Sequence, residues 1–188
     1  MIRVAINGYG RIGRSVLRAV YESELQDQIR IVAINEPADI KTIAHLTCYD
    51  STHGRFKGEV KYHDEVLSVC GDQIQIVHQE DLTALSWADL DIDVVLECSG
   101  SFSDRLTAQQ HLNCGAKRVL FSQPAESDVD ATIVYGFNHS QLDGTEKIIS
   151  GASCSTNCVI PVIQVLNQRF SVEGGVITTI HSAMNDQP

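Results

Sequence analysis

The stretch IRVAINGYGRIG, residues 2–13, decides the fold. Residues 2–7 read as a short apolar strand, a turn with the spacing GxGxxG follows, and the helical period begins at Arg11. In such units the glycines let the main chain turn tightly beside a pyrophosphate, and free amides at the helix start bind its charge. The stretch therefore predicts a dinucleotide site, whose candidate residues are Asn7, Gly8, Gly10, Arg11, Ile12 and Gly13.

An acidic residue after the second strand supports this interpretation. Residues 29–35 (IRIVAIN) read as a buried strand, and Glu36 follows it directly. A carboxylate there accepts hydrogen bonds from the adenosine ribose hydroxyls and repels a 2′-phosphate, so we expect NAD rather than NADP. The simpler alternative, an ordinary turn with an unrelated glutamate, requires strand, turn, helix and acid to fall in register by chance.

Strand-like and helix-like runs alternate along most of the chain. This pattern predicts an α/β fold, a Rossmann-type, doubly wound and mostly parallel sheet over residues 1–151. Residues 152–188 read as the start of an α+β catalytic domain, with too little structure to close a core, so we expect a truncated form of a longer chain. The expected strands are 2–7, 29–35, 73–78, 93–98, 118–121, 132–135 and 176–181, with a hairpin at 59–70 and helices beginning near 11, 39, 104 and 154.

The stretch SGASCSTNC, residues 150–158, carries a candidate nucleophile. Ser153 is a good N-cap, so Cys154 falls in the first turn of a helix, where the helix dipole and free amides stabilise a thiolate. A thiolate adds to an aldehyde and, after hydride transfer, leaves a thioester. His181, at the end of an expected strand, is the candidate general base.

Most free cysteines are small packing residues, and that is the competing interpretation of these thiols. We adopt it for Cys158, one turn after Cys154, and expect it to point into packing. We adopt it also for the four cysteines that precede them, Cys48, Cys70, Cys98 and Cys114.

The composition of the 188 residues excludes several classes of partner. A net charge of −10 disfavours nucleic acid and acidic membrane surfaces, and no segment approaches the roughly 20 apolar residues of a membrane helix. The six cysteines lack CxxC spacing and no signal peptide is visible, so we expect reduced thiols, a cytoplasmic location and no metal site.

Four motifs resemble the glyceraldehyde-3-phosphate dehydrogenase family: INGYGRIGR (6–14), YDSTHGRF (49–56), SGASCSTNC (150–158) and TTIHS (178–182). The similarity runs along the whole chain. It implies Cys154 as nucleophile, His181 as the residue that activates it, and NAD contacts at Arg11, Ile12 and Glu36. It further implies that Ser122 lies near the nicotinamide, that Ser153, Cys154 and Ser155 contact a phosphorylated aldehyde, and that the full-length protein is a homotetramer.

Within that family the chain is most similar to the erythrose 4-phosphate branch. Glu36 replaces the usual aspartate, Met184 replaces a phosphate-binding threonine, and residues 181–187 (HSAMNDQ) follow that branch. The branch implies oxidation of D-erythrose 4-phosphate to 4-phosphoerythronate, with water resolving the thioester, in pyridoxal phosphate biosynthesis. A phosphorylating triose enzyme and a fragment that only binds NAD stay open as alternatives. Glu80 departs from the family, where many members have a cofactor-binding arginine.

Overall fold

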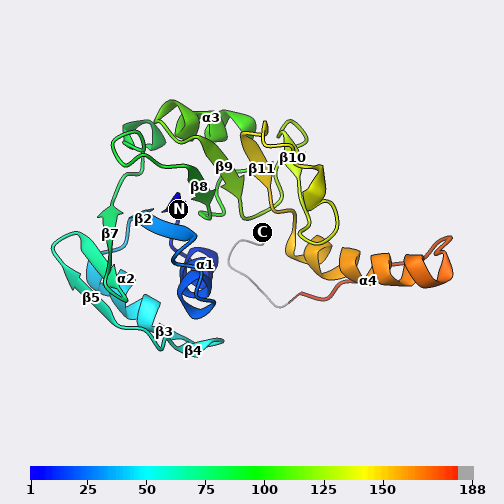
Figure 1. The fold of residues 1–188 in the computed structure, drawn as a ribbon, viewed down its shortest axis with the longest axis horizontal. Helices are drawn as coiled ribbons and strands as arrows, with labels where there is room; N and C mark the ends of the chain where they lie inside the picture. Colours follow the sequence, from blue (N-terminus) through cyan, green and yellow to red (C-terminus); the bar gives the residue numbers. More distant parts are fainter. Residues whose placement is uncertain (182–188) are drawn as a thin grey trace.

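The structure, a computed structural model, describes residues 1–181 and contains a nine-stranded sheet of order β10-β11-β9-β8-β1-β2-β7-β6-β5 (Figure 1). Neighbouring strands from β10 to β7 run parallel, whereas β6 pairs antiparallel with both β7 and β5. The predicted doubly wound, mostly parallel sheet is therefore confirmed. The strands are β1 (Ile2–Asn7), β2 (Ile29–Asn35), β5 (Val60–His63), β6 (Val66–Val69), β7 (Asp72–Val77), β8 (Val94–Glu97), β9 (Arg118–Phe121), β10 (Ala131–Thr132) and β11 (Ile148–Ser150), with β3 (Tyr49–Asp50) and β4 (Gly54–Arg55) forming a separate ladder.

The helices begin where the sequence places a cap. Asp39 accepts hydrogen bonds from the amides of Lys41 and Thr42, and Asp104 accepts one from the amide of Thr107. These bonds satisfy main-chain donors that a helix start otherwise leaves free. The helices are α1 (Arg11–Glu22), α2 (Ile40–Cys48), α3 (Arg105–Asn113) and α4 (Cys154–Phe170), with short 3-10 turns η1 (Leu82–Ala84) and η2 (His139–Gln141).

Packing covers both faces of the sheet. Val4 and Ile6 of β1 point into the cluster beneath α1 and α2, whereas Ala5, between them, points into the opposite cluster with Trp87. Figure 1 likewise shows α1 and α3 on opposite sides of the sheet. Strands buried on both faces need continuous apolar runs, which explains why β1, β2 and β8 lack a polar alternation.

The strand order reverses direction at β1, because β2 lies on one side of it and β8 on the other. In doubly wound sheets the loops diverge at such a point and leave a crevice at the carboxyl ends of the strands. Here the two loops still touch at their base. Gly8 has a φ of +87°, and a Cβ atom added to it would lie 2.4 Å from Ser99 Cα. Only glycine permits both this conformation and this approach.

The strand pattern differs from prediction in several places, and the short strands β3 and β4 were not expected. The expected strand at 132–135 is shorter, because Asn138 Oδ1 accepts a hydrogen bond from the Val134 amide and starts a turn. Strand β11 was not predicted, since three residues are too few to show a period. The strand expected at 176–181 is wrong: residues 171–181 form no regular element, and within residues 1–181 no strand pairs with them.

Helix α4 begins at Cys154 as predicted and continues through Pro161, but it projects away from the sheet (Figure 1). None of its residues is buried, and the apolar side chains of Val162, Val165 and Phe170 face solvent. Among residues 1–181 no helix is long and apolar enough to cross a lipid bilayer.

The approach of Gly8 to Ser99 can be tested with one methyl group. We expect Gly8→Ala to lower the free energy of unfolding by about 3 kcal/mol, because a left-handed conformation and a main-chain clash are penalised together. Gly144→Ala is the matched control: its φ is +93°, but no atom lies within 4 Å of the added Cβ. It should lose only about 1 kcal/mol in urea unfolding. Equal losses in the two variants would show that the loops do not meet.

Candidate active site

The glycine turn leaves the start of α1 open. Gly10 is the N-cap residue and no side chain caps the helix, so the amides of the first turn stay available to an anion. A Cβ added to Gly10 would meet nothing within 4 Å, whereas one added to Gly13 would lie 2.4 Å from the Gly8 carbonyl oxygen. Gly13 thus allows α1 to pack closely against the turn, and Gly10 faces open space beside Arg11 and Ile12.

Glu36 lies beside this turn. Its Oε2 accepts a hydrogen bond of 2.7 Å from the Tyr9 amide, and its Oε1 accepts one of 3.3 Å from the Ala38 amide. The carboxylate is half-buried at the end of β2. The fold therefore brings together the glycine turn and the acid that the sequence placed in one cofactor site, although they are 27 residues apart at Tyr9 and Glu36.

His78, which the sequence analysis did not single out, contacts Glu36. His78 Nδ1 lies 2.7 Å from the Glu36 carbonyl oxygen, and Nε2 lies 2.8 Å from Glu65 Oε2. The hydrogen bond with Glu65 is the main reason why the pKa of His78 is raised. No local signal marks this link, because it joins the hairpin of β5 and β6 to the loop after β2.

Ser122 and Cys98 lie at the ends of adjacent strands. The Ser122 amide donates a 3.0 Å hydrogen bond to the Glu97 carbonyl oxygen. Burial raises the pKa of Cys98 to about 11, although a hydrogen bond with Ser122 acts in the opposite direction. Cys98 is therefore a protonated packing residue, as predicted.

The segment before α4 is tied to this edge of the sheet. The Gly151 amide donates to the Phe121 carbonyl oxygen at 2.9 Å, one residue before Ser122. Ala152 is buried in the left-handed region with a φ of +60°, and its amide donates to Ser150 Oγ at 3.1 Å. These contacts fix the path of the chain that leads from β11 to the candidate nucleophile.

Cys154 is exposed in the first turn of α4. Ser153 is the N-cap, as predicted, and its Oγ accepts a 2.9 Å hydrogen bond from the Thr156 amide. Asn157 Nδ2 donates to the carbonyl oxygens of Gly151 and Ser153 and so braces the turn. The Cys154 thiol is therefore accessible at a capped and braced helix start.

His181 reaches the same turn through Ser155. Its Nε2 lies 3.2 Å from Ser155 Oγ, and the imidazole is exposed. Among residues 1–181 no hydrogen bond joins His181 to Cys154 itself, so the structure places the histidine next to the residue that follows the thiol. Met184 and the rest of the 182–187 motif lie outside the described residues.

Two packing predictions for the cysteines are wrong. Cys158 and Cys70 are exposed: Cys158 lies on α4, none of whose residues is buried against residues 1–181, and Cys70 lies in the turn before β7. All six cysteines are free thiols, and no group of metal-ligating side chains occurs among the described residues.

The predicted residues gather at one edge of the sheet, because parallel strands end on the same side. The side chain of Asn7 does not face this edge as the prediction implied: it is buried and contacts Glu97 and Asn35. A separate cavity of about 500 Å³, lined by Arg105, Asp130 and Lys147 among others, contains none of the predicted site residues. The loops at the edge that holds the predicted residues follow β1 (Gly8 to Gly13), β2 (Glu36), β8 (Cys98 and Ser99), β9 (Ser122) and β11 (Gly151 to Cys154).

Comparison with known families agrees with this geometry. Residues 2–105, more than half of the chain, match the model described as "Glyceraldehyde 3-phosphate dehydrogenase, NAD binding domain". Residues 153–188 match the model described as "Glyceraldehyde 3-phosphate dehydrogenase, C-terminal domain". The glycine turn, the open helix start and Glu36 are the donor and acceptor set that NAD requires. The chain therefore belongs to the glyceraldehyde 3-phosphate dehydrogenase family of NAD-dependent aldehyde dehydrogenases.

Proposed function

We propose that this protein oxidises D-erythrose 4-phosphate to 4-phosphoerythronate through a thioester on Cys154. The observation that carries the proposal is the exposed Cys154 thiol at a capped helix start, tethered to the sheet edge where the cofactor turn lies. The choice of substrate is supported by the sequence alone, through Glu36 and Met184. The resemblance of the sequence to this family also supports a homotetramer, a cytoplasmic location and a domain boundary after residue 151.

The proposed chemistry divides one oxidation into two steps. His181 takes the thiol proton through the Ser155 hydroxyl, and the Cys154 sulfur forms a bond to the aldehyde carbon. As this bond forms the carbonyl π electrons move to the oxygen, and they re-form the C=O bond when a hydride leaves the carbon; bound NAD would supply the acceptor for that hydride. The resulting thioester is attacked by water, the carbon–sulfur bond breaks, and the acid is released as the thiol regains its proton.

A second candidate is that the described chain only binds NAD. This is favoured by one observation: none of the residues of α4 is buried, so the helix that carries Cys154 lacks the packing that would hold the thiol in place. Under this reading the cofactor site is intact, whereas the thiol does not turn over substrate.

Substrate choice is tested by comparing kcat/KM for erythrose 4-phosphate and glyceraldehyde 3-phosphate in the native enzyme. We expect a preference of about ten-fold or more for the four-carbon aldehyde. Met184 replaces the threonine whose hydroxyl binds the substrate phosphate in the triose enzymes of the family, and the phosphate of a longer aldehyde has to bind elsewhere. Turnover should not require inorganic phosphate. A preference for the triose, together with a phosphate requirement, would identify the phosphorylating activity instead.

Replacing the nucleophile should separate chemistry from binding. We expect Cys154→Ser to abolish NADH formation and to leave the NAD affinity unchanged, because the side chain touches only the aldehyde carbon. Cys158→Ser is the matched control, since Cys158 is equally exposed one turn further along α4 and should retain activity. Iodoacetamide should label Cys154 faster than Cys158. Normal turnover by Cys154→Ser would exclude the thioester.

Glu36 should decide between the two dinucleotides. We expect Glu36→Gln to weaken NAD binding about ten-fold, because hydrogen bonds to a charged group are lost, and to weaken NADP binding less. Glu22→Gln, whose carboxylate contacts Arg18 instead, is the control. Calorimetric titration with each nucleotide measures the ratio of NAD to NADP affinity. An unchanged ratio would show that Glu36 does not contact the adenosine ribose.

A further inference from the structure

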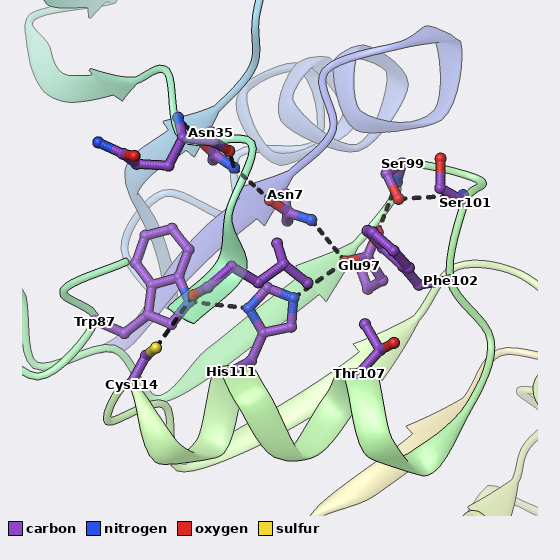
Figure 2. A network of polar contacts seen from close by, with 12 residues as sticks. Asn7, Asn35, Trp87, Glu97, Ser99, Ser101, Phe102, Thr107, His111 and Cys114 are labelled. Carbon is purple, nitrogen blue, oxygen red and sulfur yellow. Dashed lines mark hydrogen bonds and ion pairs between the residues drawn. The ribbon is translucent and has the colours of Figure 1, made fainter. Parts of the chain in front are cut away.

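Glu97, which the proposed chemistry does not use, is a buried carboxylate at the end of β8. Figure 2 shows it at the meeting point of several polar side chains from different elements. Its Oε2 accepts hydrogen bonds from Asn7 Nδ2 at 2.6 Å and from His111 Nε2 at 3.1 Å, and its Oε1 accepts one from the Ser99 amide at 2.8 Å. Glu97 and His111 are both fully inaccessible to solvent.

The first branch of this network has a direction that main-chain atoms fix. The Gln79 amide donates to Asn35 Oδ1, and Asn35 Nδ2 donates to the Gln79 carbonyl oxygen. The amide of Asn35 therefore has one orientation, and it presents Nδ2 to Asn7 Oδ1 at 2.7 Å. Asn7 in turn can offer only its Nδ2 to Glu97.

The second branch is fixed by a tryptophan. Trp87 Nε1 lies 3.1 Å from His111 Nδ1, and an indole N–H can only donate. His111 Nδ1 must therefore accept, which leaves its proton on Nε2, facing Glu97. The imidazole is held neutral in this tautomer, since a second proton on Nδ1 would oppose the indole N–H.

All three partners thus arrive at Glu97 as donors. A protonated carboxyl or an amide at this place would oppose one of them, so Glu97 is an ionised acceptor. The only group within ion-pair distance of it among residues 1–181 is His111, which the indole keeps neutral. A buried charge held by neutral donors alone is costly, and it persists where a fixed geometry depends on it.

That geometry is the base of the cofactor crevice. Asn7 immediately precedes Gly8, and Ser99 is the residue whose main chain lies against Gly8. One carboxylate therefore holds both walls, one through the Asn7 side chain and the other through the Ser99 amide. We propose that Glu97 is a positioning residue for NAD, fixing the spacing between the loops after β1 and β8 without touching the cofactor. The inference rests on the assignment of this crevice as the NAD site.

The isosteric variant Glu97→Gln tests the proposal. Its amide group must face either Ser99 on one side or Asn7 and His111 on the other, so one wall shifts. We expect the dissociation constant for NAD to rise about ten-fold or more at a temperature where the variant stays folded. Ile74→Val is the control, because Ile74 is fully buried in β7 and its truncation destabilises the sheet without entering the network. The control should keep its NAD affinity.

Nitrogen NMR of the His111 ring in the wild-type chain gives a second measurement that needs no variant. We expect the neutral Nε2–H tautomer at pH 7. An Nδ1–H tautomer or an imidazolium would overturn the inference, and so would a Glu97→Gln variant that binds NAD within two-fold of the wild type. If the wild type does not bind NAD, the assignment of the cofactor site is wrong and this inference is wrong with it. If the wild type binds NAD but Glu97→Gln binds it equally well, only the inference about Glu97 is wrong.

Discussion

The close main-chain contact between Gly8 and Ser99 is the constraint on which the rest of the site depends. A side chain at Gly8 would overlap the loop after β8, so the two loops meet there through main-chain atoms. Below this contact Glu97 receives donors from both loops, and above it the start of α1 presents free amides. The free amides and the buried carboxylate thus lie on opposite sides of one turn.

The topology of the sheet places the chemistry. The loops that follow parallel strands lie at a single edge of the sheet, so Cys154, the candidate nucleophile after β11, lies at the same edge as the glycine turn after β1. The chain between them is fixed by main-chain hydrogen bonds, from Gly151 to Phe121 and from Ser122 to Glu97. The segment that leads to Cys154 is therefore linked to the loop after β8 through the end of β9.

Local patterns in the sequence were sufficient for part of this arrangement. The glycine turn, the acid at Glu36 and the N-cap at Ser153 each depend on a few adjacent residues, and the structure contains them as predicted. The contacts of His78 and His111 join segments far apart in the chain, so no local pattern indicates them. The apolar run at 176–181 fails as a strand for the converse reason, since a strand needs a partner and none is present among the described residues.

Mapping NAD on the backbone amides by NMR is the most direct test of the crevice. On titration, the largest shifts are expected at Gly8 to Gly13, which form the turn, at Glu36, whose side chain accepts a hydrogen bond from it, and at Ser99, whose main chain lies against it. Ser122 should shift as the nicotinamide approaches the end of β9. Shifts confined to the cavity beside Arg105 and Lys147, with the glycine turn unperturbed, would contradict the account.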